Sequence, residues 1–231
     1  MKRLLLLSAG MMLCSATSVL AQKKSNLDGE KILADFARCA VRATPRETAK
    51  LLDTLPESES ERLQVGWLLQ KHGRCLKFGP SIQDRQLAAE LSLGRTTLES
   101  AFRQSSGQLK HMRFPSRALR GAIAERLYLE TRDAQPLAMS ISDPIVDRGS
   151  LLPVGYAVVR CAAEKDTVSA DRLVRAPRLS LAEASAARDF GPALQMCARG
   201  KQHVDISGTA IHGWAAEALY KMRRPVAMKE R

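Results

Sequence analysis

The sequence predicts an all-α protein made of two homologous small helical modules. Apolar residues recur at intervals of three and four in several segments, and helix-capping patterns precede these segments. A repeated cysteine spacing indicates that one unit occurs twice. The chain has 231 residues, a formal net charge of +12 and 45% hydrophobic residues, with two Trp, three Tyr and five Phe. This composition is typical of a globular protein and excludes collagen-like or largely disordered chains.

The first 21 residues are expected to be a secretory signal peptide and not part of the fold. Lys2 and Arg3 precede a short apolar run, and the segment ends with small Ala21. This order of a basic start, an apolar region and a small-residue cleavage site is typical of such peptides. A retained amino-terminal anchor is the alternative. Cleavage would leave a basic mature chain in the periplasm or outside the cell, with no transmembrane segment.

Four cysteines remain after cleavage, and their spacing is repeated. Cys39 and Cys75 are 36 positions apart, as are Cys161 and Cys197, and the two pairs are offset by 122. An even number of cysteines in an exported chain favours disulfides, for which four cysteines allow three connectivities. If each module closes its own pair, the bridges are Cys39–Cys75 and Cys161–Cys197. Each bridge would then join the first helix of a module to the third.

Matching flanks support an internal duplication. Arg38 to Ala40 matches Arg160 to Ala162 at the offset of 122, and residues 119–128 resemble residues 211–220 at an offset of 92. The smaller offset implies an insertion near 79–110 in the first copy. The predicted organisation is a signal peptide at 1–21, a first module at 22–130, a linker at 131–152 and a second module with a short basic tail at 153–231.

Local patterns predict the individual helices. Thr44 precedes Pro45 and so caps a helix whose first residue is proline. Ser58 with Glu61 and Ser180 with Glu183 form the same capping box in both copies. Gly191 and Pro192 predict an interruption of the helix that follows Ser180. The last helix of each module carries an apolar stripe, which includes Leu119 in the first module and Leu219 in the second. Trp214 and Tyr220 are expected in the core, and Gly121 and Gly213 predict close helix packing.

Residues Leu87 to Arg103 resemble the helix-turn-helix of a transcription regulator. Export would separate the protein from the chromosome, and the same segment resembles the terminal motif of the modules. We therefore expect no nucleic-acid partner, and DNA binding is the reading that applies if the signal peptide prediction is wrong.

The opening "RCAVRATP" with a second cysteine 36 residues on, together with "LRGAIAERLY" and "IHGWAAEALY", resembles uncharacterised exported proteins of alphaproteobacteria, especially of the sphingomonad type. The resemblance covers most of the predicted mature chain. It implies location and construction, and no activity.

The sequence lacks the common nucleophile, phosphate-binding and zinc signatures, so we predict no catalytic residues, no metal and no cofactor. Glu125 and Glu217 occupy corresponding places, and we interpret them as a solvated or salt-bridged helix face. The predicted function is non-enzymatic binding of an envelope protein or of an anionic envelope component. The alternative is a small periplasmic enzyme with a site between the modules. The candidate binding residues are Arg117, Arg120, Glu125, His212 and Glu217.

Overall fold

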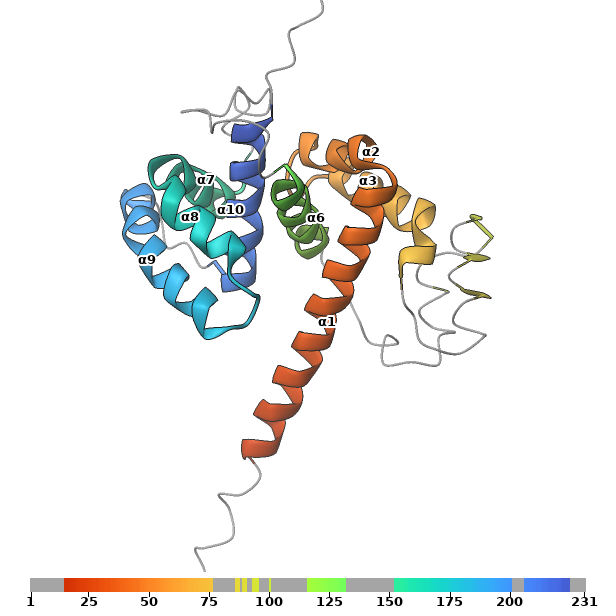
Figure 1. Cartoon of the computed structure of the whole chain (residues 1–231), viewed down its shortest axis with the longest axis horizontal. Coiled ribbons are helices and arrows are strands. Elements are labelled where there is room, and N and C mark those ends of the chain that lie inside the picture. Colours follow the sequence, from red (N-terminus) through yellow and green to blue (C-terminus); the bar gives the residue numbers. More distant parts are fainter. Residues whose placement is uncertain are drawn as a thin grey trace, which may run out of the picture.

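A computed structural model describes residues 15–76, 116–131, 152–200 and 206–224, together with 86–87, 89–90, 93–95 and 100. Side chains are described from residue 29 onward. Within these ranges the secondary structure is helical and contains no strand, which confirms the predicted all-α class. Figure 1 shows the helices in two groups, with α6 and α10 adjacent between them.

The first group, here called the first half, covers residues 15–131. Thr44 lies at the predicted position before the proline that starts the second helix, but its side chain makes no capping hydrogen bond, and its hydroxyl instead lies 2.9 Å from Nε2 of His72. Ser58 accepts a hydrogen bond from the backbone N–H of Glu61 and so begins the third. Its helices are α1 (Ser15–Ala43), α2 (Pro45–Ala49), α3 (Glu59–Lys71) and α6 (Ser116–Glu130), with 3-10 turns at Lys50–Asp53 and Gly73–Cys75.

The second half covers residues 152–224. Asp166, Ser180 and Ser207 each cap a helix by accepting a hydrogen bond from the backbone N–H three residues later. These caps satisfy donors that a helix start would otherwise leave free. The helices are α7 (Val154–Lys165), α8 (Thr167–Arg175), α9 (Leu181–Ala198) and α10 (Gly208–Arg223).

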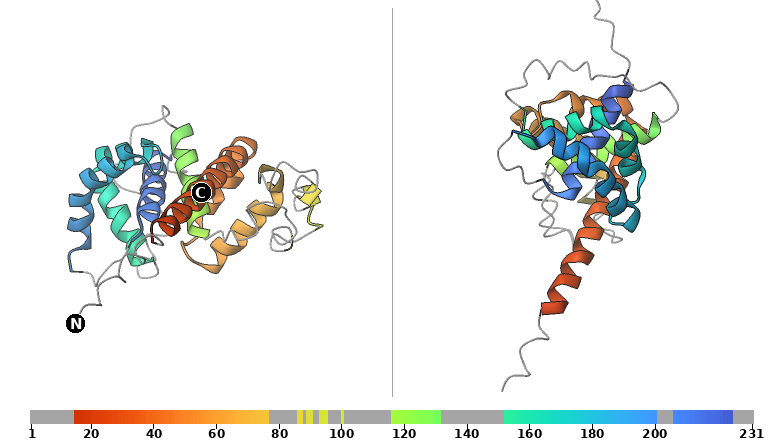
Figure 2. Two further views of the ribbon diagram at one scale, coloured as in Figure 1. Left: turned by 90° about the horizontal axis from the view of Figure 1, so that it is seen from below. Right: turned by 90° about the vertical axis from the view of Figure 1, so that its left-hand side faces the viewer.

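Helices α6 and α10 join the two halves, and both views in Figure 2 keep them close together. Gly121 and Gly213 face each other at their crossing. A Cβ atom on Gly213 would lie 2.7 Å from the Cα of Gly121, and one on Gly121 would lie 2.9 Å from the Cα of Gly213. No side chain fits there, so the predicted close helix packing at these glycines is confirmed. The two glycines allow polar groups on either side of the crossing to reach across it.

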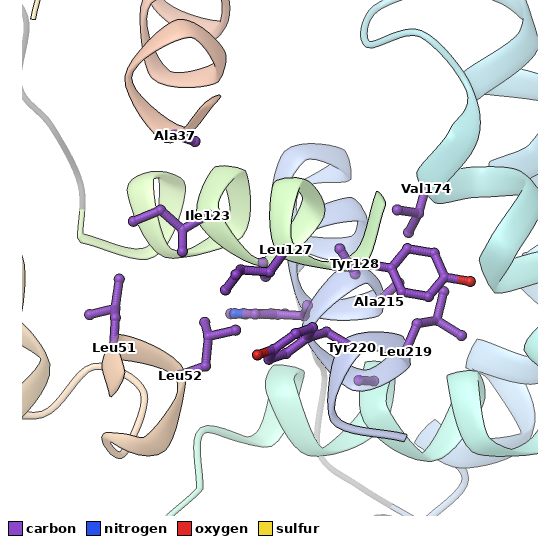
Figure 3. Close-up of a cluster of buried hydrophobic side chains, with 14 of the residues drawn as sticks. Ala37, Leu51, Leu52, Ile123, Leu127, Tyr128, Val174, Ala215, Leu219 and Tyr220 are labelled. Carbon is purple, nitrogen blue, oxygen red and sulfur yellow. The ribbon is translucent and has the colours of Figure 1, made fainter. Parts of the chain in front are cut away.

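Apolar side chains from both halves form one core around this crossing, part of which Figure 3 shows. Leu119 and Leu219 are fully buried, and Trp214 and Tyr220 retain 6% and 8% of their exposure. The predicted stripes and the predicted core positions of these two aromatic residues are therefore confirmed. Continuous burial across the crossing stabilises the association of the two halves.

Both predicted disulfides are present, Cys39–Cys75 in the first half and Cys161–Cys197 in the second. Their Cα atoms are 5.7 and 5.9 Å apart. In the second half the bridge joins the first and third helices, α7 and α9. In the first half it joins α1 to the 3-10 turn directly after α3.

The predicted interruption at Gly191 and Pro192 is wrong, since α9 continues through both residues to Ala198. Proline removes one backbone hydrogen bond, to the carbonyl of Arg188, but Pro192 and Arg188 are exposed and water can bind that carbonyl. Most of the helix-turn-helix-like segment, the predicted insertion and the predicted linker lie outside the described residues. Among the described helices, none has the length and apolar character needed to cross a membrane.

Candidate functional site

The five predicted binding residues separate into one exposed residue and four that meet at the α6–α10 crossing. Arg117 is exposed. Arg120 and Glu217 are fully buried, as is His212, and Glu125 retains 22% of its side-chain exposure. The four inner residues form two clusters, one on each side of the paired glycines, which we call the Arg120 cluster and the His212 cluster.

In the Arg120 cluster, the guanidinium of Arg120 binds Glu217 of the other half through two hydrogen bonds of 2.7 Å. It also lies 3.6 Å from Glu61 of its own half. Its remaining N–H groups donate to the backbone carbonyls of Leu51, Leu52 and Thr54 and to the Thr54 hydroxyl, at 2.9–3.1 Å. Arg120, on α6, therefore joins residues 51–54 and the start of α3 to the second half.

Glu217 has two further partners that sequence reasoning missed. The Tyr156 hydroxyl donates to it at 2.9 Å, and the Lys221 ammonium lies 3.0 Å away. No motif marks Tyr156, but the i, i+4 spacing of Glu217 and Lys221 on one helix is a signal that could have paired them. Of the two interpretations of Glu217, a solvated or a salt-bridged position, the salt-bridged one is correct, and the salt bridges lie inside the protein.

The charges in this cluster stabilise each other strongly. Burial alone would raise the pKa of Glu217, but the adjacent charges of Arg120 and Lys221 and their hydrogen bonds lower it to about 2. Burial alone would lower the pKa of Arg120, whereas Glu217 and the neighbouring Tyr156 and Glu61 raise it overall. Both groups of the Arg120–Glu217 pair are therefore charged at neutral pH.

In the His212 cluster, the imidazole lies between carboxylates from the two halves. Its Nδ1 is 2.7 Å from Glu183 of its own half, and its Nε2 is 3.4 Å from Glu125 of the other half. Arg178, in the turn between α8 and α9, donates to Glu125 at 3.1 Å and lies 4.0 Å from Glu30 on α1. Two residues, His212 and Arg178, thus balance the glutamates on this side.

The carboxylates of this cluster also have lowered pKa values. For both Glu125 and Glu183, burial alone would raise the pKa, but their neighbours lower it overall: the nearby His212 and Arg178 for Glu125, and the hydrogen bond with His212 for Glu183. The backbone N–H of Leu179 also donates to Glu183 and contributes to the lowering there. The ionised forms of these two glutamates are therefore favoured in the folded protein.

The two capping boxes position the outer glutamate of each cluster in the same way. Glu61 accepts a hydrogen bond from the backbone N–H of Glu57, and Glu183 accepts one from the backbone N–H of Leu179. Both residues of the second pair lie 122 positions after their counterparts in the first. Glu57 and Leu179 have φ angles of 61° and 60°, an unusual conformation for residues other than glycine. The capping boxes thus fix the start of a helix and aim a carboxylate at the crossing.

Each cluster retains one buried atom without a hydrogen bond, Glu61 Oε1 in the first and His212 Nε2 in the second. The two atoms lie in different kinds of pair: Glu61 faces Arg120 within the first half, whereas His212 Nε2 faces Glu125 of the other half. No group of three His, Cys, Asp or Glu side chains suited to holding a metal ion occurs in the described part of the chain. The chemistry that the clusters support is mutual charge stabilisation between helices.

Arg117 lines a surface hollow of about 320 Å³ between the first turns of α3 and α6. Arg62 also lines it and forms a surface ion pair with Glu59. The wall is completed by Glu57, Ser58, Glu59 and Ser116. Of the five predicted binding residues, Arg117 is the one placed where a partner can contact it.

Comparison of the chain with protein-family models, with curated proteins and with solved structures found no match in any of the three. The fold and the two clusters are therefore interpreted from their own geometry.

Proposed function

We propose that this chain is an exported, non-enzymatic helical protein of the periplasm or cell envelope that binds an envelope partner. In this proposal its two halves derive from one helical unit by duplication, and the resemblance to exported alphaproteobacterial proteins belongs to the same proposal. The observation that carries it is the use of the polar groups at the crossing. Arg120, Glu217, His212 and Glu125 stabilise the contact between the halves, so they build a scaffold.

Export is supported by the two disulfides. Structural disulfides persist mainly in oxidising compartments such as the periplasm. Cys39–Cys75 and Cys161–Cys197 each close a loop in a small helical unit, where such a bridge contributes a large part of the stability. The predicted signal peptide at 1–21 leads to the same compartment.

Duplication is supported by matching details of the two halves. The disulfides share a sequence separation of 36, and the capping boxes share their hydrogen bonds and the positive φ of the residue before the cap. Gly121 matches Gly213 at the crossing, and Arg120 and His212 precede them. These agreements recur at the two offsets found in the sequence alignment.

An anionic or acidic partner is supported by the charge of the chain and by Arg117. Without residues 1–21, which contain Lys2, Arg3 and no acidic residue, the chain keeps 34 Lys and Arg against 24 Asp and Glu, a net charge of +10 that attracts anions. Arg117 and Arg62 lie beside one hollow on the first half, where a phosphate or carboxylate group of a partner could contact them. The enzymatic alternative would require Glu125, Glu217 or a histidine as an acid or base; Glu125 and Glu217 form ion pairs within the protein, and the buried His212 faces two glutamates.

Two experiments test this proposal. Expression of the full chain with a carboxyl-terminal tag, followed by cell fractionation and amino-terminal sequencing, should recover a chain that begins at Gln22 in the periplasm. Recovery of an uncleaved chain in the cytoplasm would contradict export.

Binding is tested with the purified mature protein and envelope fractions or lipopolysaccharide over a range of salt concentrations. We expect association that weakens with salt and that Arg117→Glu reduces. The matched control Arg172→Glu changes an exposed arginine far from the hollow and should reduce association less. Absence of any salt-sensitive association, together with failure to recover any envelope protein, would contradict this function.

A further inference from the structure

We propose that the His212 cluster is an acid-sensitive joint between the two halves: protonation of its carboxylates loosens the contacts of α10 with α6 and with the start of α9, while the Arg120 cluster keeps the other side of the crossing closed. This inference concerns the contact between the halves and does not depend on the proposed partner or location.

The geometry makes the charge state of this cluster decisive. Glu183 on α9 and Glu125 on α6 face opposite nitrogens of one buried imidazole. Nδ1 is within hydrogen-bonding distance of Glu183, whereas Nε2 has no hydrogen-bond partner and faces Glu125 at 3.4 Å. Arg178 approaches Glu125 from the turn before α9, and Glu30 approaches Arg178 from α1. Among the described residues, Glu183, Glu125, Arg178 and Glu30 are the charged groups of this cluster.

Protonation of either glutamate removes a charge that this cluster needs. A protonated Glu125 no longer balances the charge of Arg178, and a protonated Glu183 loses its charge beside the fully buried ring of His212. The glutamates hold α6 and α9 against the imidazole of α10, so the loss affects contacts within and between the halves. Gly121 and Gly213 lie beside the cluster and supply no side chains that could replace those contacts.

The direction of the pH dependence follows from the pKa shifts. Glu125 and Glu183 have lowered pKa values in the folded protein, so their ionisation contributes stability above the ordinary value of 4.5, and this stability is lost as the pH falls through the lowered values. On the other side of the crossing, Arg120 also donates to the backbone carbonyls of Leu51, Leu52 and Thr54, which do not titrate, and the pKa of Glu217 is lowered to about 2. Arg120 does not lose its proton in this range. Acid should therefore open the His212 side first.

Hydrogen exchange measured by mass spectrometry on the full chain with both disulfides intact tests this order. The two capping boxes supply matched reporters: residues 179–186, where Leu179 N–H binds Glu183, and residues 57–64, where Glu57 N–H binds Glu61. After correction for the intrinsic exchange rate, lowering the pH from about 7 to about 3 should reduce protection of 179–186 by about tenfold before 57–64 changes. Simultaneous loss in both segments, or loss first in 57–64, would overturn the proposal.

A pair of variants tests the role of the titrating carboxylate. Glu125→Gln removes one acid from the cluster, so the acid-induced change at 179–186 should shrink relative to the wild type. Glu130→Gln is the control, since Glu130 lies on the same helix and pairs with Arg126 near the surface. It should retain the wild-type response. A full acid response in Glu125→Gln would count against the joint, and the wild-type comparison of the two segments decides the matter if this variant does not fold.

Discussion

Arg120 and His212 occupy corresponding positions on α6 and α10, one residue before the glycines that touch, and each contacts a glutamate of the other half and a glutamate of its own. The guanidinium has five N–H donors and satisfies both a carboxylate and three backbone carbonyls. The imidazole has two nitrogens, and Arg178 supplies a guanidinium on its side of the crossing. The same arrangement thus places a guanidinium at one position and an imidazole at the other.

The two clusters also differ in their access to water. Arg120, Glu61 and Glu217 are at most 1% exposed, whereas Glu125 and Glu183 retain 22% and 17%. A buried charge that loses its partner is costly, and solvent reduces that cost. The Arg120 cluster should therefore contribute more to the stability, and the His212 cluster more to the response to pH.

Removal of the arginine should have the largest effect. Arg120→Met leaves the Glu217 carboxylate buried without its arginine partner, and we expect a loss of about 3–5 kcal/mol in the free energy of unfolding. His212→Gln keeps a hydrogen-bonding group and should cost about 1–3 kcal/mol. Urea denaturation at neutral pH measures both. Equal losses from the two substitutions would break the distinction between the clusters.

The disulfides should contribute equally to the two halves. Replacing Cys39 and Cys75 together by Ala, or Cys161 and Cys197 together by Ala, should each cost about 2–4 kcal/mol, because the closed loops have the same length. Urea denaturation of the two double variants compares them. A large effect from one pair and none from the other would show that the halves do not depend on their bridges in the same way.

Substitution of the paired glycines should have an intermediate effect. The Cβ of Gly213→Ala would meet the Gly121 backbone at 2.7 Å, so the helices must separate, at a cost of about 1–3 kcal/mol. Gly66→Ala is the matched control, because it lies within α3 with no neighbouring atom within 4 Å, and it should be neutral or stabilising. Thermal unfolding distinguishes them. A neutral Gly213→Ala would mean that the crossing tolerates a wider separation.

The smallest expected effects concern the helix caps. Ser58→Ala and Ser180→Ala each remove a hydroxyl that accepts a hydrogen bond from a backbone N–H, that of Glu61 or of Glu183. Each substitution should cost about 1 kcal/mol. Ser58→Ala should cost somewhat more, because the Ser58 hydroxyl also donates to the backbone carbonyl of Leu55. Circular dichroism during thermal unfolding measures both losses, and a larger loss in Ser180→Ala would contradict this expectation.

Features that depend on neighbouring residues in the chain could be predicted from the sequence. The boxes at Ser58 and Ser180 need only a hydroxyl and a glutamate three residues later, and both were predicted correctly. The disulfide pairing followed from a spacing repeated in the chain. The continuation of α9 through Pro192 could not be predicted, because it depends on that helix face being exposed to water.

The charge clusters could not be predicted because they depend on how the halves meet. Arg120 and Glu217 are 97 residues apart, and no local pattern shows which face of α6 the other half covers. Glu125 and Glu217 were found as corresponding residues, but their partners Arg178 and Tyr156 have no counterparts in the other half that a repeat would reveal. The residue types at the crossing were thus found in the sequence, and their pairing required the structure.

The association of the halves through charges made across the α6–α10 crossing is tested most directly by a double-mutant cycle of Arg120→Met and Glu217→Leu, followed by urea denaturation. The double variant removes both charges of the pair, so it should be more stable than Arg120→Met alone, with a coupling of about 0.5–3 kcal/mol. Losses that simply add would show that Arg120 and Glu217 act independently and would contradict this account.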